Sequence, residues 1–194
     1  EASMKLNDMI RLDGAVSFGK WKFDGDAKGN YQENEYNDEG QVIGLKTTPY
    51  SYALNGLFVG DMPQTAYVMG ATLTPIKGLR LQGIFKMYDK NYSDWSPNAR
   101  EYDGSDADAD RSQVWQAPKY NRLDLHGSYK LPKIGGLDMS INAHIFNALD
   151  AVYVQDAVDN SQYNGFGDKL HLPHNAEVFL GTPRYANIGL VVNF

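Results

Sequence analysis

Aspartates recur at alternate positions in one stretch of the chain, a spacing typical of a calcium-binding loop. Asp106, Asp108 and Asp110 match the first three ligand positions of such a loop. Arg111 stands where the loop requires glycine, and Ala117 stands where it requires a bidentate glutamate, which excludes an EF-hand. We therefore expect either a looser Ca²⁺ site on these three aspartates or a solvated acidic loop.

Histidines offer a second kind of metal chemistry. His171 and His174 are three residues apart, and Asp168 and Glu177 lie close to them in sequence. This spacing supplies half of a metal site, because metal sites in proteins commonly pair closely spaced ligands with a second such pair elsewhere. The sequence shows no second half, so the alternative is a histidine pair without a metal.

Aromatic residues suggest binding by stacking. The chain has 13 Tyr, 8 Phe and 3 Trp, and many gather in two stretches rich in polar residues. Such rings can stack on sugars or other flat ligands at the mouth of a cavity. Our candidate ligand-binding rings are Tyr92, Trp95, Tyr102, Trp115, Tyr153 and Tyr163. The alternative for each ring is packing within the protein or at a membrane interface.

Nothing in the sequence predicts an enzyme or a nucleic-acid binder. The chain has no cysteine, which excludes a thiol nucleophile, a thiolate zinc site and a disulfide framework. It has no Gly-x-Ser-x-Gly motif, and the Gly165–Gly167 segment is too short for a phosphate-binding loop. The net charge of −6 excludes a generic polyanion binder, because such proteins need a basic surface.

The elements that must position these residues are predicted to be β-strands. Apolar and polar residues alternate with period two, as where Leu123 and Leu125 alternate with Asp124 and His126. About ten residues is the length of a strand that crosses a bilayer obliquely, and no apolar run is long enough for a membrane helix. The alternation predicts strands at about 9–23, 65–74, 79–92, 120–131, 137–147 and 185–194.

The connections between these strands alternate between short and long. Two of them, Thr74–Gly78 and Pro132–Gly136, are tight turns, whereas 24–64, 93–119 and 147–184 are long. The long segments hold 18 acidic and 7 basic residues, while the rest of the chain holds 6 acidic and 11 basic. Short turns at one end and long loops at the other are typical of outer-membrane barrels, whose charged strand face needs water.

The last strand carries a pattern typical of barrel insertion. Asn187, Gly189, Val192 and Phe194 have the spacing that outer-membrane barrels present to their insertion machinery, and a terminal aromatic ring suits the bilayer interface. The sequence opens on Glu1, without a methionine, a basic region or an apolar stretch of the kind that begins a signal peptide. We therefore expect a mature product or a piece of a longer protein.

Several ordered segments resemble one family. They are Ala117-Pro118-x-Tyr120 with Leu123-Asp124-Leu125 and Tyr129-Lys130-Leu131; Ile145-Phe146-Asn147-Ala148-Leu149-Asp150 with Tyr153; Gly181-Thr182-Pro183-Arg184 with Gly189 and Phe194; and Val59-Gly60-Asp61-Met62-Pro63-Gln64. In order and spacing they resemble the C-terminal part of TonB-dependent outer-membrane receptors. The resemblance covers about Ile10 to Phe194.

The resemblance implies an all-β fold, namely a transmembrane antiparallel up-and-down barrel of 22 strands, of which residues 1–194 supply about the last six. The plug domain that fills such barrels is absent from this chain. The implied partners are the rest of the barrel, its plug, the TonB protein acting through that plug, the lipid bilayer and a surface lipoprotein. The implied function is active import of a siderophore, cobalamin, haem, glycan or peptide across a Gram-negative outer membrane. His126 and His144 would then face the barrel interior.

Two other interpretations remain open at this point. One is a small complete barrel of eight strands, a porin or adhesin, in which 41–46 and 50–59 add a hairpin within the membrane. The other is a soluble carbohydrate-binding β-sandwich, whose strands also alternate because one face meets a core.

Overall fold

The computed structural model describes residues 1–103, 105, 107, 109–133, 135–160 and 171–193. The described part is built from strands and short 3₁₀ turns, and its strands pair almost entirely antiparallel. The prediction of an all-β, antiparallel fold is thus confirmed. Within the described residues, no helix has the length and apolar character needed to cross a membrane.

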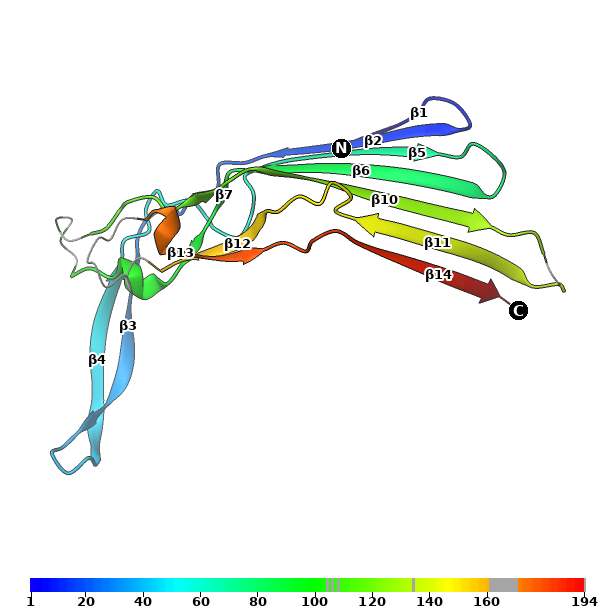
Figure 1. Ribbon diagram of the computed structural model, residues 1–194. Helices are drawn as coiled ribbons and strands as arrows, with labels where there is room; N and C mark the ends of the chain where they lie inside the picture. The colour runs from blue at the N-terminus through cyan, green and yellow to red at the C-terminus, as the bar shows by residue number, and fades with distance from the viewer. Residues whose placement is uncertain (104, 106, 108, 134, 161–170, 194) are drawn as a thin grey trace.

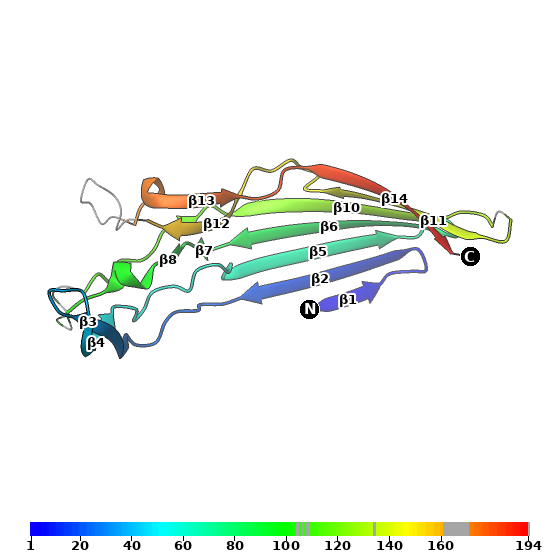
Figure 2. The ribbon, with the colours of Figure 1, turned by 90° about the horizontal axis from the view of Figure 1, so that it is seen from below.

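One long sheet dominates the molecule (Figures 1 and 2). Its strand order is β1-β2-β5-β6-β10-β11-β14, and every neighbouring pair is antiparallel. The strands are β1 (Ala2–Lys5), β2 (Ile10–Phe18), β5 (Thr65–Leu73), β6 (Leu79–Asp89), β10 (Tyr120–Lys130), β11 (Asp138–Phe146) and β14 (Tyr185–Asn193). Six of these lie within the ranges that alternation predicts. The four-residue β1 was not predicted, because so short a segment shows no periodicity.

The register of the sheet collects the apolar residues on one face. Leu81, Gly127, Ala143 and Ile188 form one cross-strand row, and parallel rows on the same face repeat this composition. The opposite face carries charged and polar side chains, since residues alternate across a strand. The alternation read from the sequence therefore becomes two chemically distinct faces.

The apolar face has no protein layer packed against it in the described residues. Large apolar side chains stay strongly exposed there, among them Val16 at 60%, Met69 at 57% and Ile188 at 80%. The sheet is also open, because β1 and β14 are not paired with each other. The described residues thus form an open sheet and not a closed barrel.

Tight turns join the strands at one end of the sheet. Gly78 adopts φ +86° in the β5–β6 turn, and a Cβ there would lie 3.1 Å from the Lys130 carbonyl oxygen. Gly135 and Gly136 also have positive φ in the β10–β11 turn. Glycine suits these positions because it alone enters this region at no steric cost.

The other end carries the long segments, which hold more structure than the sequence indicates. The segment 24–64 contains a hairpin of β3 (Ala27–Tyr36) and β4 (Val42–Tyr52), which projects away from the sheet (Figure 1). The small-barrel interpretation expects a membrane hairpin of 41–46 with 50–59. The structure instead pairs β3 with β4, and these two strands form a sheet separate from the large one. Both faces of the hairpin are largely exposed, so its sequence has no clear apolar periodicity.

Short elements complete the loop end. They are β7 (Asn91–Tyr92), β8 (Asp94–Trp95), β9 (Gln116–Ala117), β12 (Val154–Asp159), β13 (Ala176–Leu180), and the 3₁₀ turns η1 (Pro97–Arg100) and η3 (Pro173–Asn175). The buried core lies here and not in the large sheet: Leu54, Leu57, Trp95 and Val114 pack together. Burial of these side chains supplies the hydrophobic free energy that orders the long segments.

Candidate functional site

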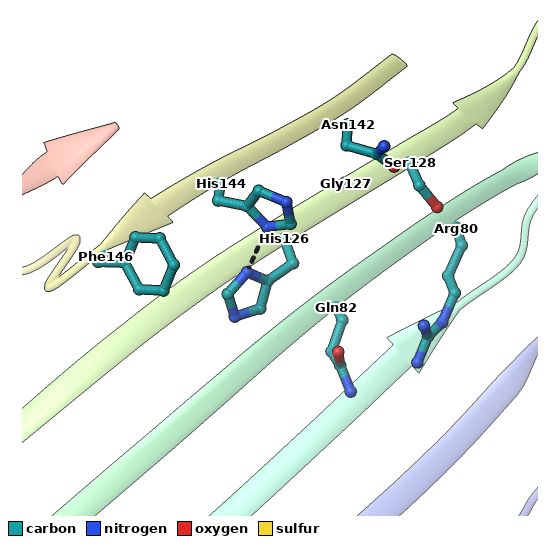
Figure 3. A pocket seen from close by; sticks show the side chains of 8 residues that line it. All are labelled: Arg80, Gln82, His126, Gly127, Ser128, Asn142, His144 and Phe146. Carbon is teal, nitrogen blue, oxygen red and sulfur yellow. Dashed lines mark hydrogen bonds between the residues drawn. The ribbon is translucent and has the colours of Figure 1, made fainter. Parts of the chain in front are cut away.

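The polar face of the large sheet contains a hollow of about 430 Å³ (Figure 3). It is lined by Arg80, Gln82, His126, Gly127, Ser128, Asn142, His144 and Phe146. The side chains come from β6, β10 and β11, whose register places them side by side. The lining offers one permanent cation, two imidazoles, two amides, a hydroxyl and an aromatic ring.

Two histidines meet in this hollow. His126 and His144 are direct cross-strand partners, and their Nδ1 atoms lie 2.8 Å apart. One ring must donate a proton from Nδ1 and the other must accept it, since two protonated Nδ1 atoms would repel. Gln82 is the register partner of His126 on the other side, and Asn187 is that of His144. The four side chains form one polar row across four strands.

An aromatic platform borders the histidine pair. The rings of Phe146 and Tyr185 are stacked with centroids 4.7 Å apart and an interplanar angle of 16°. His126 and Phe146 make an edge-to-face contact, with ring centroids 5.4 Å apart and an interplanar angle of 72°. Stacked rings of this kind present a flat apolar surface beside polar groups, which suits a ligand with one apolar face.

A buried carboxylate fixes the loop-proximal part of the same face. Asp124 accepts hydrogen bonds from Lys86 Nζ at 2.9 Å and from the Asn147 backbone N–H at 2.9 Å, and Arg122 lies 3.4 Å away. Its side chain is 2% exposed. Two cations and a backbone donor offset the cost of burying this charge.

Stacked tyrosines join this face to the last long segment. Tyr153 stacks on Tyr120 at 4.3 Å, and Arg122 Nη1 donates a hydrogen bond to the Tyr153 hydroxyl at 3.1 Å. A Cβ at Gly181 would lie 1.9 Å from the Tyr153 ring. The glycine therefore makes room for the ring.

A buried ionic network ties the long segments 93–119 and 147–184 together. The guanidinium of Arg100, at the end of η1, lies 3.3 Å from Asp110 and 3.8 Å from Asp159 of β12. His171 Nε2 contacts Asp110 at 2.8 Å, and its Nδ1 contacts Asp159. Arg100 is fully buried, and the side chains of Asp159 and His171 are almost so.

The network determines the protonation states of its members. Hydrogen bonds to Asp110 and Asp159 raise the pKa of His171 to about 9, against the opposing effect of burial. Burial alone would raise the pKa of Asp110, but hydrogen bonds from His171 and Ser112 N–H and the charge of Arg100 lower it overall. At neutral pH, His171 is therefore an imidazolium between two carboxylates.

A second ionic contact holds the base of the β3–β4 hairpin. Arg111 donates two hydrogen bonds of 2.9 Å to Asp26, and the Tyr102 hydroxyl donates one of 2.8 Å. Hydrogen bonds from Arg111 and from the Asn55 backbone hold the pKa of Asp26 well below its usual range. This bidentate pair joins segments 85 residues apart in sequence.

Asp61 shows the opposite shift. Burial, a shared hydrogen bond with Asp156 and the nearby charge of Asp94 raise the pKa of Asp61 to about 6. Its backbone has φ +61°, a left-handed conformation that aspartate tolerates better than most residues. The carboxyl is thus partly protonated near neutral pH.

The candidate stacking rings are mostly engaged in packing. Trp95, Tyr102 and Tyr153 are buried, Tyr92 stacks on Phe58 at 4.2 Å, and Trp115 is half-buried. Tyr163 lies outside the described residues. Their role as ligand-stacking rings stays a prediction, and the structure places them in separate contacts and not around one common hollow.

The proposed metal ligands and insertion residues are described only in part. Asp110 pairs with Arg100 and His171, while Asp106 and Asp108 lie outside the described residues. In the part of the chain that the structure describes, no group of three or more His, Asp or Glu side chains is placed to bind a metal. Asn187 and Gly189 lie on the polar face of β14 and Val192 on the apolar face; Phe194 is not described.

Sequence reasoning did not identify Arg100 or Asp159. Neither residue belongs to a motif, and their partners lie between 10 and 71 positions away in the sequence. His171 was considered as a metal ligand, but both of its ring nitrogens contact carboxylates. Comparison with family models, with curated proteins and with solved structures found no match to this chain.

Proposed function

We propose that this chain forms part of the wall of a TonB-dependent outer-membrane receptor, a 22-stranded barrel that imports a large or scarce nutrient. The observation that carries the proposal is the unbroken apolar face of the seven-stranded sheet, which contacts no second layer in the described residues. Acyl chains of an outer membrane would cover that face. The segment resemblance described above supports the choice of family.

The strand dimensions agree with a membrane wall. The six long strands contain 9 to 11 residues each, close to the length that spans the hydrocarbon region when tilted. An exposed apolar surface that extends over seven strands would be an aggregation hazard in water, because soluble monomers rarely expose patches of more than a few hundred Å². Lipid removes that hazard.

The polar face would line the lumen. Charged groups such as Lys86, Arg122 and Asp124 lie there and pair with one another. The plug and the passing nutrient would contact this face. The acidic, internally packed long segments would lie on the outer surface, where they would meet the nutrient and a surface lipoprotein.

Single-cysteine labelling of the whole protein in its membrane tests which face meets lipid; this chain contains no cysteine, and any cysteine elsewhere in the protein is first replaced by serine. Leu125→Cys and Ser128→Cys lie on opposite faces of β10. A fluorophore at position 125 should be quenched by nitroxide lipids, and one at position 128 by a water-soluble quencher. Equal quenching of both fluorophores by the water-soluble quencher would overturn the membrane assignment and favour a soluble sandwich.

Two further measurements distinguish a receptor from a small porin. The native protein should have an intact mass several times the 21.7 kDa of this chain, and nutrient uptake should stop when the inner-membrane proton gradient is collapsed. A native species of about this chain's mass whose uptake does not depend on energy would exclude the receptor.

A further inference from the structure

We propose that the facing Nδ1 atoms of His126 and His144 form a two-nitrogen site for a borderline divalent cation of the Zn²⁺, Ni²⁺ or Cu²⁺ class. The inference rests on the fold of the sheet and on a wet polar face, and it does not depend on transport. It goes beyond the proposed receptor function, which assigns these histidines no ligand.

The spacing of the two nitrogens suits a shared metal ion. Two bonds of about 2.0–2.1 Å that meet at one ion at angles of about 90–109° separate the nitrogens by roughly 2.9–3.4 Å. The observed separation is 2.8 Å, so a small rotation of both rings opens the site. The rings are inclined by 60° with centroids 5.0 Å apart, and each must rotate away from the direct Nδ1–Nδ1 line before both lone pairs can reach one ion beside that line.

The backbone positions the two rings before any ion binds. His126 and His144 are register partners in adjacent antiparallel strands, and both strands are paired on their outer sides as well. Cross-strand partners keep their Cβ atoms about 4.5–5.5 Å apart. A site held on rigid strands needs little reordering when a ligand arrives, which favours affinity.

Binding of a cation needs only a tautomer change. In the free pair, one ring donates its Nδ1 proton to the other ring. With an ion on both Nδ1 atoms, that proton moves through water to Nε2 of the same ring, and both rings remain neutral ligands. Water or the side-chain oxygens of Gln82 and Asn187, which share the row, are available for the remaining coordination positions.

The charges around the site determine which ions it accepts. Arg80 lines the same hollow, so a bound cation meets a positive neighbour, and Lys86 nearby is paired with Asp124. Binding must therefore depend on nitrogen donation and not on attraction to negative charge. Imidazole donors suit zinc, nickel and copper, whereas calcium and magnesium prefer oxygen ligands.

The test is titration of the whole purified receptor in detergent with ZnCl₂, NiCl₂ or CuCl₂ alone, with CaCl₂ as the hard-cation control. We expect one stoichiometric ion per chain and no calcium effect at this site. His126→Gln and His144→Gln should each weaken binding by on the order of 100-fold, because each removes one arm of a chelate. His174→Gln, the same change in the loop region, should leave the affinity unchanged.

Two more measurements keep the test decisive if a histidine variant folds poorly. Electron paramagnetic resonance of the Cu²⁺-loaded wild-type protein should show two equivalent nitrogen ligands, and Arg80→Gln should tighten binding by removing the adjacent charge. The proposal fails if the wild-type protein binds none of the three ions stoichiometrically. It also fails if folded His126→Gln and His144→Gln proteins bind as tightly as the wild type. If the wild-type protein binds the metal ion but shows no energy-dependent nutrient uptake, that result counts against the receptor function and not against the metal site.

Discussion

Substitution of His171 by glutamine should loosen the loop end in a pH-dependent manner. The imidazolium lies between Asp110 and Asp159 beside the buried Arg100. Glutamine keeps the polarity and approximate size of the side chain but removes its positive charge. The two carboxylates then retain Arg100 as a cationic partner and lose His171, and breaking a buried charge network is strongly destabilising.

The magnitude follows from the pKa of His171, which rises from 6.5 to about 9 on folding. A group whose pKa is raised in the folded state contributes its full stability below the unfolded pKa and loses it as the pH rises through the folded pKa. The contribution is about 3 kcal/mol near pH 6, about 2–3 kcal/mol at pH 7 and close to zero above pH 10. The pKa shift of Asp110 reflects the same contact and is not added.

Hydrogen exchange of the whole protein in detergent measures this effect locally. Peptides that cover η1 and β12 should show an opening constant roughly 70-fold higher in His171→Gln at pH 7, after correction for intrinsic exchange rates. The difference from wild type should shrink to nothing near pH 10. His126→Gln, the same change in the large sheet, is the matched control and should leave these peptides as protected as in the wild type. Equal protection at pH 7, or a difference that persists at pH 10, would refute the assignment of a charged His171.

Three further predictions concern other parts of the molecule. Ile141→Arg should destabilise the membrane-inserted protein by about 2–4 kcal/mol while the adjacent Asn142→Arg costs little, because a charge at mid-bilayer depth must face lipid at one position and water at the other; denaturant unfolding from vesicles measures both, and equal costs would count against the two-faced wall. Asp61→Asn should stabilise the adjacent loop at pH 8 and leave it nearly unchanged below about pH 4, because raising the pKa of Asp61 from 3.8 to about 6 disfavours its folded carboxylate increasingly as the pH rises through that range; since the Asp61 side chain is only partly covered, we expect at most about 1 kcal/mol, and proteolysis with a protease active at each pH would show it, whereas destabilisation at pH 8 would contradict it. Gly181→Ala should displace the Tyr153 ring, which a Cβ would meet at 1.9 Å, and should cost about 1–3 kcal/mol by overpacking; thermal unfolding compared with a Gly189→Ala control, where a Cβ meets nothing within 4 Å, tests it, and equal melting temperatures would show that the ring relaxes freely.

The long strands can be predicted from the sequence because each has one predominantly apolar face. Alternation requires only that the two faces meet different surroundings, and β10 satisfies this from Arg122 to Lys130 and β11 along its whole length. The β3–β4 hairpin was not readable for the opposite reason. Its two faces are both exposed, so no periodic apolar signal separates it from a loop.

The residues of the candidate site could be predicted only in part from the sequence. Alternation placed His126 and His144 on the polar face, but nothing local to either residue indicates that they are register partners. Their pairing depends on the length of the β10–β11 turn, since a shift of one residue in register would move every side chain to the other face. The aromatic candidates could be found by residue type, but residue type does not indicate whether other side chains cover the ring. The sequence therefore could not separate rings free to bind a ligand from rings packed inside the protein.

The sequence by itself determined the all-β, antiparallel character of the fold, the six long strands and the separation of apolar from charged faces, because these depend on contacts with a period of two residues. Only the tertiary structure decided that Arg100, Asp110, Asp159 and His171 share one buried network. The physical reason is distance along the chain: residues up to 71 positions apart leave no local pattern, and their contact exists only once the long segments have packed on their own core.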